Sequence, residues 1–242
     1  MRVNCHVLSC NLINQSIHQV ILKPEGGLNV VYEAGQYLNL LLADGKPCSF
    51  SIASNCRRTH LLELHILEIP SESSSRDVIS MLARENTVKA ELPFGDCTLA
   101  ALPLLSETEP LIFIAAGTGF AQAKSLLEEV FARSLPNPVH LYYGVRKAAD
   151  FYLQDLIESW QQAHPQFKYV PVISEADEAC RWQGREGLLH EVIREDFQHL
   201  EDARVFLCGS PQMVYATLDV LVGHGLDKTR AYSDVFSYAP RD

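Results

Sequence analysis

The sequence has few basic residues for its length: 20 Lys and Arg stand against 30 Asp and Glu among 242 residues, for a net charge of −10. Nucleic acids and anionic membrane surfaces are bound through concentrated Lys and Arg, so we expect neither as a partner. No apolar run approaches the roughly 20 residues that a membrane-spanning helix needs. Polar residues interrupt every apolar group of residues 1–15, so we expect no signal peptide and a cytoplasmic protein.

The seven cysteines lack the spacings of structural or metal-binding clusters. Their number is odd and no secretion signal is expected, so a disulfide framework is not predicted. There is no C-x-x-C pair and no C-x4-C-x2-C run, which argues against a plant-type iron–sulfur cluster. His60 and His65 lie five apart around an alternating segment, where we expect surface positions of a half-buried strand rather than ligands. We therefore predict no metal and no iron–sulfur cluster.

Residues 1–104 have the pattern of short β-strands separated by turns. Apolar and polar side chains alternate along residues 62–66, as in a strand with one buried face. A single helix interrupts the strands, because residues 74–77 resemble a capping box and residues 78–82 supply an apolar stripe. Many short strands at regular spacing with one helix predict an antiparallel barrel.

From residue 105 onward, strands alternate with helices. Residues 110–116 form a continuous apolar run, as expected for a strand buried on both faces of a parallel sheet. The pattern then predicts a helix at 121–132, a strand at 139–145, a helix at 151–163, strands at 167–173 and 204–210, and a helix at 212–223. This alternation predicts a doubly wound α/β domain over residues 105–242, with its ligand site beyond the C-terminal ends of the strands.

Three strand ends of this second domain are candidates for chemistry. Gly117, Thr118 and Gly119 lead from a buried strand into a helix, where backbone N–H groups and the helix dipole can bind a pyrophosphate. The third glycine of GxGxxG and the P-loop lysine are missing, so a tight turn without a ligand is the alternative. Arg146 can pair with a phosphate or be a lone surface arginine. Cys208 ends another strand and, taken alone, is most often an inert buried side chain.

Six short motifs then follow one another through the chain: AGQY (34–37), SFSIAS (49–54), PFG (93–95), AGTGF (116–120), YGVR (143–146) and CGSPQM (208–213). In this order and spacing the chain resembles the ferredoxin–NADP reductase superfamily, and within it most resembles the bacterial NAD(P)H:flavin reductases. The resemblance implies a six-stranded antiparallel barrel that holds a flavin, FAD or FMN, followed by a domain for NADH or NADPH. Hydride would pass from nicotinamide C4 to flavin N5 at their junction.

The resemblance also implies roles for individual residues. The flavin would be bound by Phe50, Ser51, Ile52, Ser54, His65, Ser74, Ser75, Arg76 and Phe236. The nicotinamide nucleotide would be bound by Gly117, Thr118, Gly119, Phe120, Arg146, Cys208, Gly209 and Met213. The implied catalytic residues are Ser51 beside flavin N5, Cys208 beside the nicotinamide, and Asp234 in the C-terminal acidic–x–aromatic segment.

One position departs from the family pattern. Three residues before the serine beside N5, the family usually has an arginine that binds a flavin phosphate, whereas this chain has Cys48. Lys46, on the same strand face, or the turn at residues 73–76 can replace it only in part, because neither offers a bidentate guanidinium on that strand. We therefore expect flavin to be held mainly by its ring, as a diffusing substrate with little preference among riboflavin, FMN and FAD.

Two other functions remain open. In the first, the protein holds FAD tightly and passes electrons to a protein partner. In the second, it binds nucleotide or flavin without turnover. For the flavin reductase we expect a monomer whose reduced flavin is released to a monooxygenase, a luciferase or ferric iron; the choice between NADH and NADPH is not predicted.

Overall fold

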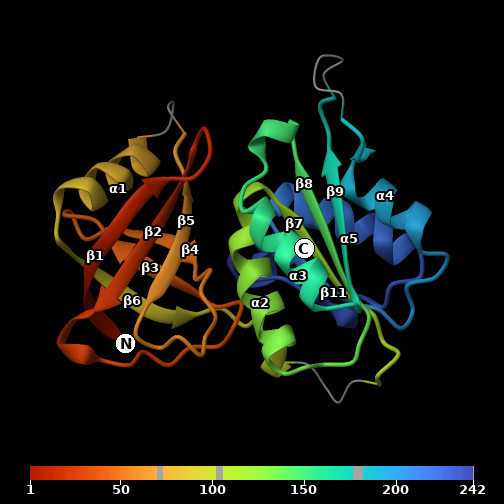
Figure 1. Ribbon diagram of the computed structural model, residues 1–242, viewed down its shortest axis with the longest axis horizontal. Helices are drawn as coiled ribbons and strands as arrows, with labels where there is room; N and C mark the ends of the chain where they lie inside the picture. The colour runs from red at the N-terminus through yellow and green to blue at the C-terminus, as the bar shows by residue number, and fades with distance from the viewer. Residues whose placement is uncertain (70–72, 102–105, 177–181, 242) are drawn as a thin grey trace.

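The computed structural model describes residues 1–69, 73–101, 106–176 and 182–241, which form two units lying side by side (Figure 1). The N-terminal unit is an antiparallel sheet of order β4-β3-β6-β1-β2-β5. Its elements are β1 (Arg2–Leu12), β2 (Ile17–Pro24), β3 (Tyr37–Leu41), β4 (Pro47–Ser51), β5 (Leu62–Leu67), α1 (Ser73–Arg84) and β6 (Thr87–Phe94). Just after β4, the Ala53 N–H donates to the Glu63 carbonyl at 2.7 Å, which brings the two outer strands together. The predicted six-stranded antiparallel barrel is confirmed.

The barrel core follows from the alternation of its strands. On β5, Leu62, Leu64 and Ile66 are buried inside the barrel, as the period of two predicts. The opposite face of β5 was expected to meet solvent, and for His65 this is wrong, since its side chain is only 4% exposed. It is covered by the second unit, where the Tyr152 ring lies edge-on to the imidazole at 5.1 Å.

The C-terminal unit is a parallel sheet of order β10-β9-β8-β7-β11-β12. Its elements are β7 (Leu111–Ala116), α2 (Phe120–Ala132), β8 (Val139–Val145), α3 (Gln154–Ala163), β9 (Phe167–Ile173), β10 (Arg185–Glu186), α4 (Leu189–Asp196), β11 (Arg204–Cys208), α5 (Pro211–Gly223), β12 (Ala231–Tyr232) and α6 (Val235–Tyr238). The doubly wound fold is confirmed; α4, β10, β12 and α6 were not predicted. The predicted boundary between residues 104 and 105 lies outside the described residues.

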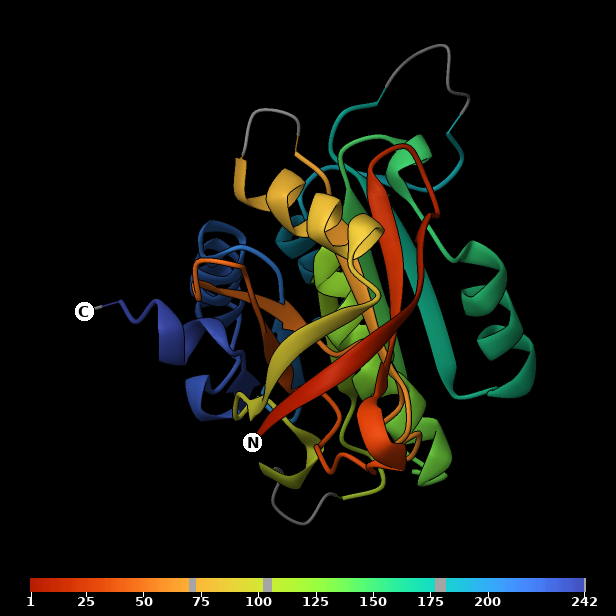
Figure 2. The ribbon, with the colours of Figure 1, turned by 90° about the vertical axis from the view of Figure 1, so that its left-hand side faces the viewer.

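Helices cover both faces of this sheet. Helices α2 and α3 lie on one face, and α4 and α5 on the other (Figures 1 and 2). Side chains of α2 and α3 pack against Phe113 and Phe206, whereas those of α4 and α5 pack against Ile112 and Leu207. All residues of β7 except Ala116 are buried, which explains why its sequence is a continuous apolar run rather than an alternating one.

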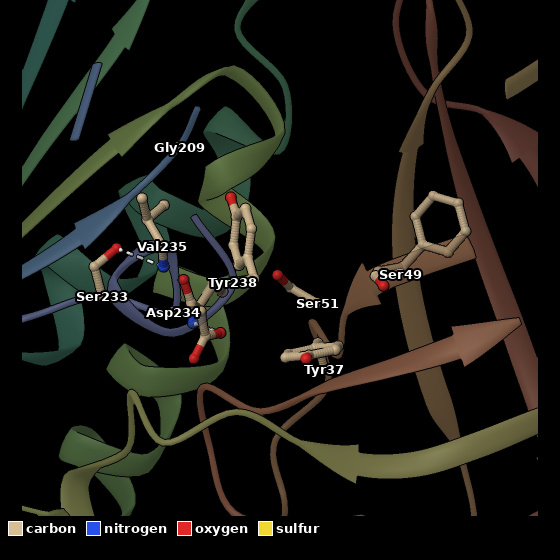
Figure 3. Close-up of a pocket in the computed structure, with 10 residues that line it drawn as sticks. Tyr37, Ser49, Ser51, Gly209, Ser233, Asp234, Val235 and Tyr238 are labelled. Atoms are coloured by element: carbon tan, nitrogen blue, oxygen red, sulfur yellow. Dashed lines mark hydrogen bonds between the residues drawn. The ribbon is translucent and has the colours of Figure 1, made fainter. Parts of the chain in front are cut away.

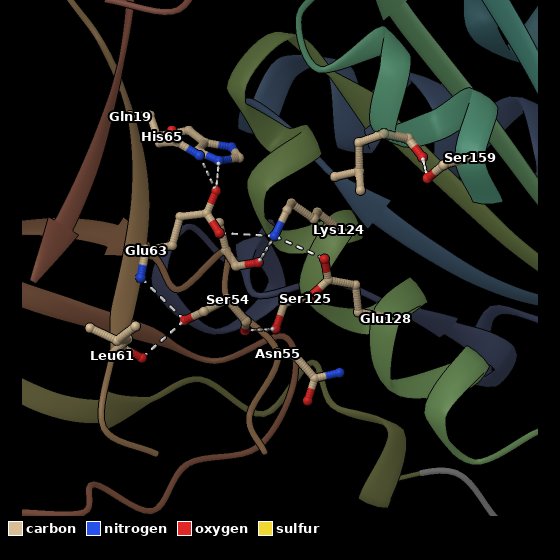
Figure 4. Close-up of polar contacts among 12 residues, drawn as sticks. Gln19, Ser54, Asn55, Leu61, Glu63, His65, Lys124, Ser125, Glu128 and Ser159 are labelled. Atoms are coloured by element: carbon tan, nitrogen blue, oxygen red, sulfur yellow. Dashed lines mark hydrogen bonds and ion pairs between the residues drawn. The ribbon is translucent and has the colours of Figure 1, made fainter. Parts of the chain in front are cut away.

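Helix α2 also packs against the barrel, and its polar side chains bond to the segment that follows β4 (Figure 4). Lys124 Nζ donates to the Ala53 carbonyl at 3.0 Å and pairs with Glu63 at 2.9 Å. Ser125 Oγ donates to the Ser54 carbonyl at 2.9 Å. These bonds fix the helix that begins at the Gly-Thr-Gly turn against the strand that carries Ser51.

Candidate active site

A cleft of about 1180 Å³ lies between the two units. From the barrel it is lined by Ser49, Phe50 and Ser51 of β4, and from the α/β unit by the Gly-Thr-Gly turn, Arg146, Gly209 and Met213. A second hollow of about 430 Å³ shares Ser49, Phe50, Ser51 and Gly209, and extends to Tyr37, Gln122, Asp234 and Tyr238 (Figure 3). The structure therefore brings together residues as far apart in the chain as Tyr37 and Tyr238.

Ser51 is placed where a ligand can reach its hydroxyl. Its backbone pairs with Tyr37 of β3 at the end of β4, and its side chain points from the barrel toward Asp234 and Tyr238 (Figure 3). Among the described residues no hydrogen-bond partner for its hydroxyl is found. Ser49, which lines the same cleft, already donates its hydroxyl to Asn39 Oδ1 at 2.7 Å.

Asp234 presents a carboxyl group from the opposite wall. It accepts a hydrogen bond from Gln122 Nε2 at 2.7 Å and one from the Cys97 N–H at 3.3 Å. Burial raises its pKa to about 6, because desolvation outweighs these hydrogen bonds. The carboxyl can therefore hold or release a proton near neutral pH.

The turn between β7 and α2 is a backbone cradle. A Cβ at Gly119 would lie 2.0 Å from the Cys208 carbonyl oxygen, so only glycine lets the two strand ends approach this closely. Gly117 has a φ of +53°, which also favours glycine. The turn leads into the 13-residue helix α2, whose first N–H groups and dipole favour an anion. Beside it, Gly209 and Met213 line the cleft, and their role in nucleotide binding stays a prediction.

Arg146 lies at the outer end of the cleft, after β8. Its side chain is 81% exposed and its Nε is 3.9 Å from Glu175, a distance at which pairing is weak. The guanidinium is thus free to meet a phosphate, and its role in nucleotide binding stays a prediction.

Several residues expected at the flavin have side chains elsewhere. Ile52 is fully buried inside the barrel, and its N–H donates to the Gln36 carbonyl. Ser54 is buried in the domain interface, with its hydroxyl 2.8 Å from that of Tyr32. Phe236 packs against Tyr215 of α5, with the ring centroids 5.9 Å apart, and Tyr238 lines the second hollow instead.

Two residues expected at the nucleotide belong to the core. Phe120 is fully buried and stacks on Tyr143, with the centroids 4.7 Å apart. Cys208 is 1% exposed, and burial raises the pKa of its thiol, so it is no ready nucleophile. Cys208 shapes the cleft through its backbone carbonyl, which lies against Gly119.

The residues expected near the flavin on β5 and α1 are hydrogen-bonded within the protein or exposed to solvent. His65 lines the cleft, but its Nε2 is 2.9 Å from Glu63 and its Nδ1 is 3.1 Å from the Tyr152 hydroxyl. Ser75 Oγ accepts from the Ile69 N–H at 3.1 Å, and Arg76 is exposed. The side chain of Ser74 lies outside the described part of the chain.

Sequence reasoning missed Gln122, Tyr37 and Tyr238. Tyr37 belongs to the AGQY motif, and Tyr238 to the C-terminal aromatic segment, so their positions carried a signal. Gln122 had a weaker one: a polar side chain between two alanines at the start of a predicted helix. No helix in the described ranges is long and apolar enough to cross a membrane, and no group of three His, Cys, Asp or Glu side chains there could hold a metal ion.

Comparison with known proteins agrees with this architecture. Residues 113–219 match the family Oxidoreductase NAD-binding domain. The chain is 30% identical to terephthalate 1,2-dioxygenase reductase component 1 of Comamonas, over 99% of this chain and 69% of that protein. It is 29% identical to the NAD(P)H-flavin reductase of Vibrio harveyi, over 98% of this chain and all of that one.

Among solved structures, a cytochrome P450 reductase of Amycolatopsis superposes with a TM-score of 0.87 at 28% identity, over 97% of this chain and 69% of that chain. The fold and the cleft thus define a two-domain oxidoreductase that uses a flavin and a nicotinamide nucleotide. The chain belongs to the ferredoxin–NADP reductase superfamily of flavoprotein reductases. It is an NAD(P)H-dependent oxidoreductase of that family, which argues against a binding module without turnover.

Proposed function

We propose that the protein is an NAD(P)H:flavin oxidoreductase that treats flavin as a diffusing substrate. The observation that supports this is the charge around Cys48, where the family usually has its phosphate-binding arginine. Lys46 is 78% exposed and is paired with Asp44 at 3.0 Å. Burial raises the pKa of Cys48, and the negative charges of Asp44 and Asp77 raise it further. A flavin phosphate would meet net negative charge there.

The cleft fits both substrates through its own residues. Phe50, Tyr37 and Tyr238 offer apolar surface to a flat ring, and the Ser51 hydroxyl can hydrogen-bond at its edge. The turn at residues 117–119 would hold the pyrophosphate of NAD(P)H. When both are bound, hydride leaves nicotinamide C4 with its two electrons and forms the bond to flavin N5. Asp234 would supply the proton that completes the reduction, and solvent would then reprotonate its carboxylate.

The second candidate is a reductase that keeps FAD bound and passes electrons to a protein partner. It is favoured by the similarity to a dioxygenase reductase component, of which this chain covers 69%. The flavin reductase of Vibrio harveyi, by contrast, is matched over its whole length. We expect reduced flavin to be released to a monooxygenase, a luciferase or ferric iron.

Titration of the purified protein with riboflavin, FMN and FAD tests the proposal. We expect colourless protein after gel filtration, similar Kd values for the three flavins, and oxidation of NADH or NADPH only when flavin is added. Cys48→Arg should tighten FMN and FAD roughly tenfold relative to riboflavin, because a guanidinium can bind phosphate in bidentate fashion. Stoichiometric FAD that survives dialysis of the wild type would instead support the bound-FAD reductase.

A further inference from the structure

A single side chain of α2 joins three parts of the molecule at the edge of the cleft. Gln122 is 5% exposed, and its amide Nε2 donates to two acceptors at 2.7 Å each. One is the carbonyl of Gly35, in the barrel turn that precedes β3; the other is Oδ2 of Asp234, near the C-terminus. Both N–H bonds of the amide are thereby used, one toward each unit.

The Asp234 carboxyl has no cationic partner among the described residues. The titratable groups that face it are all acids: Tyr238 on its own segment, Tyr37 on β3, Asp96 and Cys97 after β6, and Cys208 at the end of β11. Hydrogen bonds from neutral donors must therefore stabilise its charged form. Backbone N–H groups of Asp96 and Cys97 contribute, and the one side-chain donor among the described residues is Gln122, at 2.7 Å against 3.3 Å for Cys97.

We propose that Gln122 is a positioning residue for the reaction: it fixes the Asp234 carboxyl in the cleft opposite Ser51 and ties it to the barrel through Gly35. Two other side chains of α2, Lys124 and Ser125, bond to barrel carbonyls without reaching Asp234. The packing of α2 against the barrel can thus be tested separately from the orientation of the Asp234 carboxyl. The proposal rests on the proposed function only in taking Asp234 as the proton donor.

The test compares Gln122→Met, which keeps the length of the side chain but removes both donors, with Ser125→Ala, which removes one docking bond of the same helix. Carbon-13 NMR of the Asp234 carboxyl, assigned with Asp234→Asn, gives its titration without turnover. We expect Gln122→Met to move this titration upward from about 6 by about one pH unit, and Ser125→Ala to leave it in place.

The kinetics should follow the titration. If protonated Asp234 is the donor, the rate falls as pH rises through its pKa, so the fall should occur at higher pH in Gln122→Met. At a pH below both titrations, where Asp234 is protonated in both proteins, kcat should drop about tenfold with little change in KM for the nucleotide, because the carboxyl is no longer held in place. In Gln122→Asn, whose amide side chain is shorter, Asp234 should titrate between its values in the wild type and in Gln122→Met. This variant replaces Gln122→Met in the test if the latter does not fold.

An unchanged Asp234 titration in a folded Gln122 variant would overturn the proposal, as would an equal shift in Ser125→Ala. Failure of the proposed function has a different signature: the wild type would then not oxidise NADH or NADPH with free flavin at any pH, while the NMR titration would still report on Gln122.

Discussion

Ser49 and Ser51 lie on β4 and line the same cleft, but they differ in what their hydroxyls already bind. Ser49 donates to Asn39, whereas Ser51 points at the space between the two units. A short hydroxyl there can hydrogen-bond a ring edge without blocking a second ring that stacks on it. This difference makes the two serines a matched pair for testing chemistry at a single residue.

Replacing Ser51 by Ala should lower kcat for flavin reduction more than it changes KM for NAD(P)H. A hydrogen bond left unmade in a buried site costs about 1–3 kcal/mol, which corresponds to roughly 5- to 150-fold in rate. Ser49→Ala should have a smaller effect, because its hydroxyl is already used within the barrel. Steady-state kinetics with each flavin measures kcat and KM for the two variants. An unchanged kcat in Ser51→Ala would assign the hydroxyl a structural role.

At the scale of elements, the approach of two strand ends shapes the nucleotide side of the cleft. The β7–α2 turn and the end of β11 touch through their backbones at Gly119 and Cys208. Neither segment can move back, since β11 is paired along its whole length with residues 111–115 of β7 in the parallel sheet. A methyl group at this contact must therefore displace the turn that presents its N–H groups to the pyrophosphate.

Gly119→Ala should raise KM for NAD(P)H about 5- to 100-fold, because overpacking against a backbone carbonyl typically costs about 1–3 kcal/mol. Gly223→Ala is the control, because Gly223 is the last residue of α5 and alanine favours a helix. Apart from neighbouring residues and the backbone of the helix itself, no heavy atom lies within 4 Å of the place that the added methyl group would take. The control should leave KM unchanged. Equal effects of both substitutions on KM would contradict the role assigned to the turn.

At the scale of the whole molecule, buried and partly buried charges hold the two units together. Glu63, on β5, pairs with Lys124 of α2 and lies 2.9 Å from His65 (Figure 4). Glu129, also on α2, pairs with Arg57 of the barrel at 2.9 Å and with Arg133 at 2.8 Å. Hydrogen bonds from Arg57 and Arg133 lower the pKa of Glu129 from 4.5 to about 2. Opening the interface would expose these carboxylates to water without their partners from the other unit, Lys124 for Glu63 and Arg57 for Glu129.

Acid should therefore weaken the interface. Because the folded pKa of Glu129 lies below its unfolded value, its contribution to stability is present above pH 4.5 and is lost as pH falls through about 2. Glu129→Gln should lower Tm at neutral pH, and the difference from the wild type should shrink steadily below pH 4.5. Thermal unfolding followed across this range measures the difference. A gap that stays constant down to pH 2 would show that the charge does not matter.

The sequence by itself determined the two-domain fold, the position of the Gly-Thr-Gly turn and the strand that carries Ser51. These follow from local patterns: alternation on β5, a continuous apolar run in β7, and glycines where a strand meets a helix. Such features depend on near neighbours in the chain, and so they can be recognised without knowing what packs against them.

Only the tertiary structure decided which side chains reach the cleft. Ile52, Phe120 and Phe236 turn into cores, His65 is covered by the second unit, and Gln122 of α2 reaches Asp234. The physical reason is that α2 packs against the barrel through contacts between residues 35–63 and 122–129, far apart in the sequence. The direction of each side chain there is set by the other unit, which no local pattern encodes.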